Sequence, residues 1–237
     1  MRDVRVIEGL RGELVVSCQA YPGEPMRDPQ IMTAVALAAV AGGAAAIRAQ
    51  GLDDLSAMRP ALTVPLIGLL KVGDHDVFIT PTVTDCEAVA LAGCEIVALD
   101  GTTRARPDGS TLRDCFDAIH AAGALAMADC GSLEDAKASL SAGADVVGTT
   151  LGGYTGSRPR TVGPDFDLLA SIIAISDRPV FAEGRVRTPE DASRCLDLGA
   201  HAVVVGSAIT HPTKLTRGFV NALKRRPSTP AFAINSQ

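Results

Sequence analysis

The sequence has 237 residues, which is enough for one α/β domain with a large hydrophobic core and short for two. Its 27 acidic and 22 basic residues give a formal net charge of −5, which argues against nucleic acid or an anionic membrane as a partner, because both require a basic face. Hydrophobic residues make up 47% of the chain and charged residues 21%, as is typical of a globular protein.

The first residues of the chain carry charges before any apolar stretch of useful length, so the sequence predicts no signal peptide. Residues 6–10 are expected to form a short helix that closes the bottom of the fold, within an N-terminal cap of about residues 1–12. We therefore expect a cytoplasmic protein.

Residues 31–47 are almost wholly apolar and long enough to resemble a membrane span. They are rich in alanine, contain consecutive glycines at Gly42 and Gly43, and lead directly into Arg48. This composition favours a buried helix followed by a strand, and no membrane partner is expected.

Eight short apolar runs recur along the chain, each separated from the next by a stretch long enough for a helix. The runs are almost continuously apolar, as expected for parallel strands that are covered on both faces. Strand and helix alternating eight times indicates a closed parallel barrel. The expected strands are residues 14–19, 44–49, 65–71, 95–100, 124–129, 145–150, 179–183 and 202–206.

The sequence thus predicts the α/β class and a single (β/α)₈ TIM barrel, as one domain over residues 1–237. The last residues, about 226–237, are expected to form a frayed tail. An open doubly wound sheet is the rival fold, but it would need fewer strands or a second domain.

Glycines punctuate the chain just before the expected strands. They recur at intervals of about 50 residues, and one more precedes the fifth strand. Glycine after a helix end adopts the left-handed conformation at little cost, so each one predicts the end of a helix followed by a strand. These positions are Gly42, Gly93, Gly143, Gly199 and, before the fifth strand, Gly123.

The cysteines form no Cys-x-x-Cys pair, and no His stands at metal-ligand spacing. In a reducing compartment they are expected to act as small buried hydrophobic residues. We expect no metal ion and no cofactor. The six are Cys18, Cys86, Cys94, Cys115, Cys130 and Cys195.

Polar and charged residues stand where the expected strands end, which in such barrels is the edge that carries the active site. The odd strands end in Gln19, Lys71, Asp129 and Glu183, which should share one layer. The even strands end in Arg48, Asp100 and Thr149-Thr150. Taken singly, each has a simpler explanation: Lys71 entering solvent, Glu183 pairing with Arg185, Asp129 capping the next helix, or Gln19 as an ordinary polar strand end.

Glycine-containing turns follow the last two expected strands. Gly184 follows the seventh, and Gly206 and Ser207 follow the eighth. Barrels often bind phosphate there through backbone N–H groups, with glycine allowing close approach. His211 and Arg185 could add positive charge.

These residues lie within motifs that resemble the N-acetylmannosamine-6-phosphate 2-epimerases, and the resemblance spans roughly residues 8–223. The motifs are Ser17-Cys-Gln-Ala20, Pro22-Gly-Glu-Pro25, Gly42-Gly-Ala44, Ile47-Arg48-Ala49, Ile67-Gly68 to Lys71, Phe78-Ile-Thr-Pro-Thr82, Ala98-Leu-Asp100, Arg106-Pro-Asp-Gly109, Met127-Ala-Asp129, Thr149-Thr-Leu151, Gly153-Tyr-Thr155, Ala182-Glu-Gly-Arg185, Val203-Val-Val-Gly206 and Ala208-Ile-Thr210.

The resemblance implies a barrel of the ribulose-phosphate-binding type. It also implies conversion of N-acetylmannosamine 6-phosphate to N-acetylglucosamine 6-phosphate, a step in sialic-acid catabolism. It implies Lys71 as the base at carbon 2 and Glu183 as its acid/base partner. Gly184, Gly206 and Ser207 would hold the phosphate of this small phosphosugar, and a homodimer is left open. The remaining substrate-binding residues would be Gln19, Arg48, Asp129, Tyr154 and Arg185.

The sequence departs from the family pattern in three places. Residues 72–76, after Lys71, are shorter than the usual loop and lack its aromatic residue. Ser207 stands where a second glycine is common, and His211 stands where an arginine is common.

Inversion at carbon 2 requires a neutral amine, whereas an ordinary lysine with a pKa of ~10.4 is almost fully charged at pH 7. Ionised Glu183 and Asp129 would raise the pKa of Lys71 further. Either desolvation outweighs them, or one carboxyl is protonated and serves as the acid. Arg48 could offset part of the negative charge, and it or Gln19 could stabilise the enolate oxygen.

Two other functions stay open on the residues alone. Lys71 could instead act as the nucleophile of a Schiff-base aldolase or lyase on a phosphosugar. A non-catalytic phosphosugar-binding regulator would need the glycine turns but not Lys71 together with Glu183.

Overall fold

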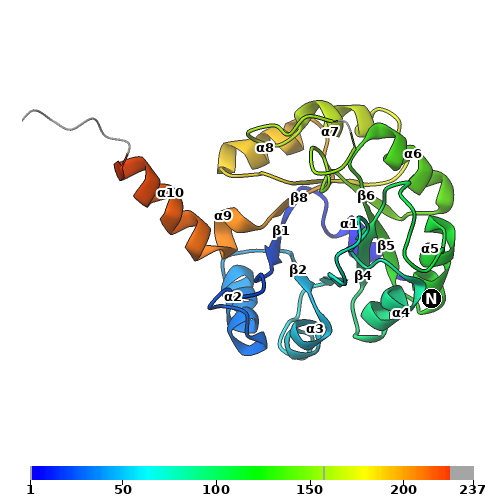
Figure 1. Cartoon of the computed structure of the whole chain (residues 1–237), viewed down its shortest axis with the longest axis horizontal. Helices are drawn as coiled ribbons and strands as arrows, with labels where there is room; N and C mark the ends of the chain where they lie inside the picture. Colours follow the sequence, from blue (N-terminus) through cyan, green and yellow to red (C-terminus); the bar gives the residue numbers. More distant parts are fainter. Residues whose placement is uncertain (1, 157, 225–237) are drawn as a thin grey trace, which may run out of the picture.

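The computed structural model describes residues 2–156 and 158–224, so the tail expected at about 226–237 lies outside the described residues. Eight parallel strands close into a barrel in chain order, with β1 paired to β8 (Figure 1). The predicted (β/α)₈ barrel is confirmed. Its strands are β1 (Glu13–Cys18), β2 (Ala46–Gln50), β3 (Leu66–Leu69), β4 (Ile96–Asp100), β5 (Leu125–Asp129), β6 (Val146–Gly148), β7 (Val180–Glu183) and β8 (Ala202–Val205).

Helices alternate with the strands and surround them (Figure 1). Most begin at a residue whose side chain accepts a hydrogen bond from a backbone N–H of the first turn; these include Thr82, Thr111, Ser132 and Thr188. The helices are α1 (Arg5–Glu8), α2 (Pro29–Ala41), α3 (Leu52–Met58), α4 (Val83–Leu91), α5 (Leu112–Ala121), α6 (Leu133–Ala142), α7 (Phe166–Ile173), α8 (Pro189–Asp197), α9 (Ser207–Thr210) and α10 (Pro212–Lys224). None of them is long and apolar enough to cross a membrane.

The core has two parts. One lies between the strands and the helices, and the other is formed by alternate strand residues, such as Ile67 and Leu69, that fill the barrel. Ile7 and Leu10 from the N-terminal segment pack against this inner part, and the His201 ring nitrogen Nε2 lies 2.8 Å from the Ile7 carbonyl oxygen. With its interior filled, the barrel offers chemistry only at its ends.

Four of the five glycines expected to follow helices are left-handed, with φ between 87° and 112° at Gly93, Gly123, Gly143 and Gly199. The expectation was wrong at Gly42, where φ is −79°. The helical conformation continues through Gly42, whose N–H still bonds to the Ala38 carbonyl, and the left-handed residue is the next one, Gly43. The strand after it accordingly begins later than expected.

Helix α10 differs from the other helices because it stands away from the barrel (Figure 1). None of its residues is buried, and its main packing neighbour is the short helix α9. Leu215, Phe219 and Leu223 are exposed along it.

Candidate active site

The charged residues at the ends of β2, β5 and β7 form one buried cluster. Arg48 donates to Asp129 over 2.5 Å and 3.2 Å, and it also pairs with Glu183. Thr150, two residues after β6, donates to Asp129 Oδ1 at 2.6 Å and to Glu183 Oε2 at 3.2 Å. The side chains of Arg48, Asp129 and Glu183 are 1%, 0% and 12% exposed. The cluster therefore sits in a water-poor interior where charges interact strongly.

Burial shapes the proton affinities of this cluster. Burial raises the pKa of Glu183 to about 7; Arg48 lowers that pKa and Asp129 raises it further. Burial alone would lower the pKa of Arg48, but Asp129 and Glu183 together raise it above its ordinary value. Glu183 can therefore carry a proton near neutral pH, while Arg48 stays charged.

One hydrogen-bond donor of Arg48 has no partner in the described part of the chain. Its Nε is the one buried side-chain nitrogen or oxygen in the described residues that has no hydrogen-bond partner. A buried donor without an acceptor costs about 1–3 kcal/mol, so an oxygen of a bound ligand at this atom would be favourable.

Lys71 lies at the base of a short hairpin after β3. It forms an isolated antiparallel bridge with Ile79, and the N–H of Val72 bonds to the Phe78 carbonyl at 3.0 Å. Burial lowers the pKa of Lys71 to about 8; Arg48 lowers it as well, against the opposing effect of the two carboxylates. Desolvation thus outweighs the carboxylates, and about a tenth of the amine is neutral at pH 7, far more than for an ordinary lysine.

Thr80 fixes this hairpin to the barrel. Its hydroxyl donates to the Ala98 carbonyl at 2.6 Å and accepts from the Leu70 N–H at 3.1 Å. Thr80 is fully buried, and its φ is +43°, an uncommon conformation for a β-branched residue. Because the strained residue is held by two hydrogen bonds, the position of Lys71 is set by β3 and β4 together.

The residues that end the odd strands were expected to meet in one layer, and the structure brings only some of them into contact. Asp129 and Glu183 meet through Arg48, which comes from an even strand, and Thr150 joins them. The Gln19 side chain donates instead to Ser17 Oγ at 3.0 Å. The local alternatives for the carboxylates do not apply: Glu183 pairs with Arg48, and helix α6 is capped by Ser132.

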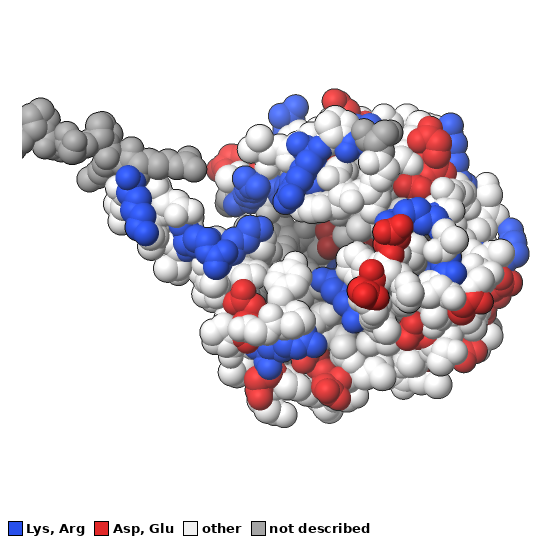
Figure 2. All heavy atoms as spheres, in the orientation of Figure 1, with Lys and Arg blue, Asp and Glu red and all other residues white. Residues whose placement is uncertain are grey.

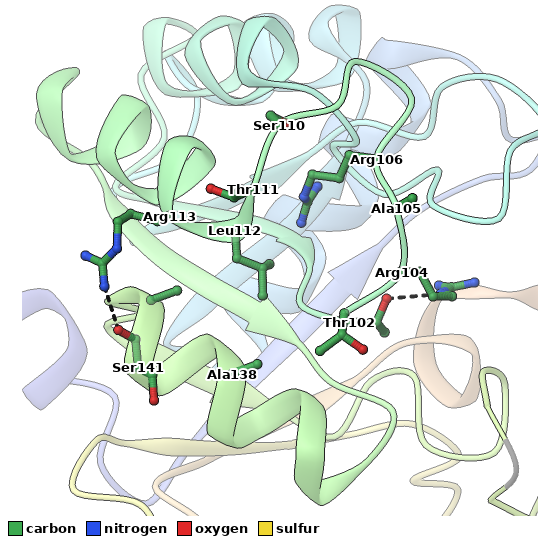
Figure 3. A pocket seen from close by; sticks show the side chains of 12 residues that line it. Thr102, Arg104, Ala105, Arg106, Ser110, Thr111, Leu112, Arg113, Ala138 and Ser141 are labelled. Atoms are coloured by element: carbon green, nitrogen blue, oxygen red, sulfur yellow. Dashed lines mark hydrogen bonds between the residues drawn. The ribbon is translucent and has the colours of Figure 1, made fainter.

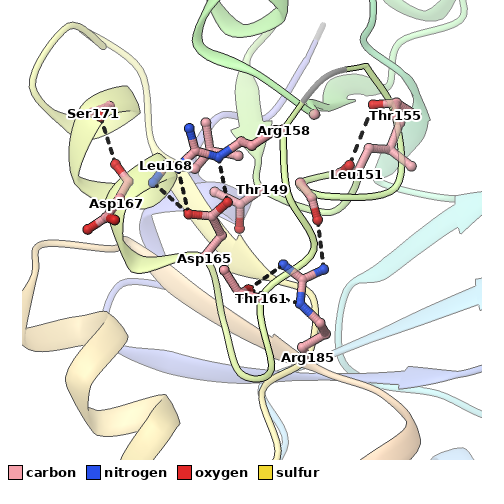
Figure 4. Close-up of polar contacts among 12 residues, drawn as sticks. Thr149, Leu151, Thr155, Arg158, Thr161, Asp165, Asp167, Leu168, Ser171 and Arg185 are labelled. Atoms are coloured by element: carbon pink, nitrogen blue, oxygen red, sulfur yellow. Dashed lines mark hydrogen bonds and ion pairs between the residues drawn. The ribbon is translucent and has the colours of Figure 1, made fainter.

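The long loop after β6 is held by Arg185, which follows β7. The guanidinium of Arg185 donates to the carbonyls of Gly152 at 2.7 Å and Gly163 at 2.9 Å, and to Thr161 Oγ1 at 2.8 Å (Figure 4). Its φ is +58°. Arg185 was expected to bind substrate, and in the structure its guanidinium donates hydrogen bonds that position this loop.

The same loop carries Tyr154, beside Arg185. Its ring centroid lies 4.8 Å from the guanidinium carbon of Arg160 and 5.2 Å from that of Arg185. Tyr154 is half-exposed. The two guanidinium groups near the ring restrict its orientation.

The glycine turns lie at the ends of two neighbouring strands. Gly184 follows β7 with φ of +104°, and Gly206 is the residue at which α9 begins, directly after β8. The Ser207 hydroxyl accepts from Lys214 Nζ at 2.9 Å. The turns are therefore adjacent and have a lysine beside them.

Tyr21, in the loop after β1, is a site residue that no sequence pattern indicates. Its ring centroid lies 5.0 Å from Lys71 Nζ. The sequence marks Thr150 only as the end of a strand, although its hydroxyl joins the two carboxylates. Proximity across loops, which has no sequence period, was the missing signal.

The described cysteines are all buried, and no group of three or more His, Cys, Asp or Glu in these ranges could hold a metal ion.

Figure 2 shows a hollow near the middle of the molecule in the same view as Figure 1.

A pocket of about 590 Å³ lies outside the barrel among α5, α6 and the loop after β4 (Figure 3). Its arginines are already engaged: Arg113 donates to the Ser141 carbonyl at 2.8 Å, Arg106 to the Pro81 carbonyl at 3.1 Å, and Arg104 to Asp100 at 2.7 Å. None of the candidate site residues lines this pocket, so it is separate from the charged cluster.

Comparison with known proteins gives one consistent result. A family model described as "Putative N-acetylmannosamine-6-phosphate epimerase" matches residues 32–225. A Cutibacterium acnes protein named as a 2-epimerase for N-acetylmannosamine 6-phosphate is 51% identical over 223 residues, covering 93% of this chain and 97% of its own. A solved structure of the N-acetylmannosamine-6-phosphate 2-epimerase from Clostridium perfringens matches with a TM-score of 0.88 and 42% identity, over 91% of this chain and 95% of that one.

Proposed function

This chain belongs to the N-acetylmannosamine-6-phosphate epimerase family, and from that membership we propose how its barrel performs the reaction. It is an isomerase that interconverts N-acetylmannosamine 6-phosphate and N-acetylglucosamine 6-phosphate. In our proposal Lys71 and Glu183 exchange protons with carbon 2. The observation that carries this assignment is the buried cluster in which Arg48 and Thr150 hold the Glu183 carboxyl, with Lys71 near enough for Arg48, Glu183 and Asp129 to affect its pKa. The pKa of Lys71 is lowered to about 8 there and that of Glu183 is raised to about 7, which suits both groups to proton transfer.

The opened sugar presents an acidic C–H next to its aldehyde. The neutral amine of Lys71 takes the proton from carbon 2, and the electron pair moves to the carbonyl oxygen as an enolate. Protonated Glu183 then delivers a proton to carbon 2, leaving an ammonium at Lys71 and a carboxylate at Glu183. This final state is the starting state of the reverse reaction, so one pair of residues serves both directions.

The other buried residues suit the charge that develops. The unpartnered Nε–H of Arg48 is a donor for the enolate or for the N-acyl oxygen. Asp129 shares the Arg48 guanidinium and so keeps it in place. Gln19 and Tyr154 would bind the sugar at the edge of the site, and Arg185 would act by holding the loop that carries Tyr154.

We assign the phosphate to the adjacent turns after β7 and β8. Gly184 and Gly206 carry no side chain that would keep an oxyanion from the backbone, and the Ser207 hydroxyl adds a donor. Phosphate binding at the ends of the last two strands is common in barrels of this type. The remote phosphate then orients carbon 2 between Lys71 and Glu183.

Turnover in D₂O, followed by NMR at carbon 2, tests the reaction. The product should carry deuterium at carbon 2 and nowhere else, and partial retention of the original hydrogen remains compatible if a shielded group returns it. A Schiff-base lyase would release smaller fragments, and borohydride would trap its imine on Lys71. Epimer formed without any exchange at carbon 2 over many turnovers would contradict the proton-transfer mechanism, and no change to the sugar would favour a binding protein.

We also propose that the protein is a homodimer in which a second copy covers α10. An isolated helix of 13 residues is marginal in water, and α10 buries none of its residues. Helix α2 is apolar on nearly all sides, yet Ile31 and Leu37 are more than 40% exposed. Two unpartnered apolar helix faces on one chain can cover each other in a pair of copies.

A further inference from the structure

Tyr21 covers the amine of Lys71 from the side of the β1–α2 loop. Its ring centroid is 5.0 Å from Lys71 Nζ, so the ring occupies space beside the amine that water would otherwise fill. An aromatic face also attracts an ammonium, which opposes a lowered pKa, but burial is the largest effect on the pKa of Lys71, so loss of the ring is expected to raise that pKa on balance. Tyr21 as a whole is half-exposed. None of the residues that we assign to the reaction or to substrate binding supplies this cover.

The ring is fixed from its other neighbours. The His211 ring lies 5.7 Å from it, centroid to centroid, with an angle of 38° between the planes. His211 Nε2 is 3.8 Å from a Glu24 carboxylate oxygen, and Thr213 donates to the other Glu24 oxygen at 2.8 Å. These contacts join the loop after β1 to the start of α10.

The backbone before Tyr21 is anchored as well. The Ala20 carbonyl accepts hydrogen bonds from Arg27 at 2.9 Å and from Gln50 at 3.2 Å. Tyr21 is therefore held between two fixed segments, although it lies in a loop.

We propose that Tyr21 is a positioning residue for Lys71, whose ring keeps the amine out of water and directed toward carbon 2. This inference rests on the proposed role of Lys71 as the base. The ring of Tyr21 supplies this cover from the loop after β1.

The pH dependence follows from the groups around the amine. Lys71 faces Arg48 from β2, Asp129 from β5, Glu183 from β7 and Arg27 from the loop after β1. Burial is the largest cause that lowers its pKa, so exposing the amine raises that pKa toward 10.5. At any pH well below the pKa of Lys71, the neutral fraction of the amine falls tenfold for each unit by which that pKa rises. Each unit of increase therefore costs tenfold in rate at acid pH and nothing above the new pKa.

The experiment compares kcat/KM from pH 6 to 10 for the wild type, Tyr21→Ala and Tyr21→Phe. We expect Tyr21→Ala to move the midpoint of the lysine limb upward by about one pH unit, with about a tenfold loss at pH 7 that shrinks toward pH 10. Tyr21→Phe retains the ring and should stay within about twofold of wild type. Phe166→Leu is the matched control, because it removes another ring that covers a cation, Arg194 at 4.1 Å, on the outer helices.

An equal loss of activity at every pH in Tyr21→Ala would indicate a merely structural role and overturn the proposal, as would an unmoved limb. A loss in Tyr21→Phe as large as in Tyr21→Ala would place the role on the hydroxyl and also overturn it. Failure of the proposed function looks different: the wild type itself would then lack the lysine limb or would not epimerise the sugar.

Discussion

At the scale of single residues, burial and the surrounding charges together determine the pKa values of Lys71 and Glu183. Two carboxylates next to a lysine would ordinarily keep the lysine protonated. Here one guanidinium, Arg48, neutralises part of their charge, and burial penalises every remaining charge. The result is a lysine and a glutamate that both titrate close to neutral pH.

Replacing Lys71 with alanine should leave the fold intact and reduce kcat by at least about a hundredfold, the usual scale of a general base. The loss follows because no other described lysine reaches the charged cluster through a contact; Lys214 contacts Ser207. Steady-state kinetics with the phosphosugar and a thermal melt measure both effects. Lys137→Ala, an exposed lysine on α6, is the control. Retention of more than about a hundredth of the activity would remove Lys71 from the role of base.

The pH dependence of kcat/KM should be bell-shaped. The reacting form needs neutral Lys71, whose pKa is lowered to about 8, together with protonated Glu183, whose pKa is raised to about 7. Because the acid has the lower pKa, this form is always a minority, and it declines below about pH 7 and above about pH 8, with its maximum near pH 7.5. The pKa of the lysine therefore sets the alkaline limb of the profile. A lysine limb close to its ordinary value of 10.5 would show that the amine is not desolvated in the working enzyme.

The residues of the site could be predicted better than their contacts. The strand-end rule singled out Lys71, Asp129, Glu183 and Arg48, because a parallel barrel brings those ends to one rim. It failed for Tyr21, which lies in a loop, since a loop's path depends on tertiary contacts that leave no periodic pattern in the sequence.

At the scale of elements, every expected strand overlaps an observed one, because buried parallel strands are continuous apolar runs with sharp ends. The hairpin after β3 was less predictable. Its shape depends on Thr80, whose left-handed φ is held by hydrogen bonds to Leu70 and Ala98 that are distant in sequence.

The substitution Thr80→Val should destabilise the protein and slow catalysis. It leaves the Leu70 N–H and the Ala98 carbonyl buried without their partner, at a cost of about 1–3 kcal/mol for each group. The loosened hairpin should lower kcat more than it raises KM, since it carries Lys71. Urea unfolding and steady-state kinetics provide the two measurements, with Ser171→Ala, an exposed hydroxyl on α7, as the control. A stable variant with unchanged kcat would show that Thr80 does not position Lys71.

The glycine turns should make the phosphorylated sugar much the better substrate, and Gly184→Ala should raise its KM. An alanine at φ of +104° is strained, which displaces the turn after β7. Gly123→Ala introduces comparable strain at φ of +88° after helix α5, so it should lower stability without changing KM. If unphosphorylated N-acetylmannosamine were turned over with a similar kcat/KM, the phosphate assignment would be wrong.

At the scale of the whole molecule, the barrel is closed and its interior is filled, whereas α10 contributes no residue to the hydrophobic core of the described chain. Its apolar residues recur at helical spacing from Leu215 to Leu223, and basic residues lie along another side (Figure 2). The direction in which the last helix leaves the barrel could not be predicted from the sequence. An amphipathic pattern indicates that one face of a helix packs against another surface, but it does not indicate whether that surface belongs to the same chain or to another.

Phe219→Glu should convert the dimer to a monomer. Phe219 is 75% exposed in a single chain, so the charge costs little there but would be buried in the dimer. Light scattering after size exclusion measures the mass, and Arg217→Glu on the polar side of α10 is the control. A wild type that is monomeric at micromolar concentration would contradict the proposed dimer outright.

The pairing of β1 with β8 has a consequence for biosynthesis. Glu13 is in register with Ala202, and Val16 with Val205, so the seam joins segments on the order of 190 residues apart. A ribosome must release the chain through β8 before this seam can form, and until then β1 keeps an unpaired edge. Glu183, at the end of β7, is synthesised only shortly before β8, so the last charged residue of the site and the last strand of the ring emerge together. We therefore expect the nascent chain to gain activity only after β8 has left the ribosome.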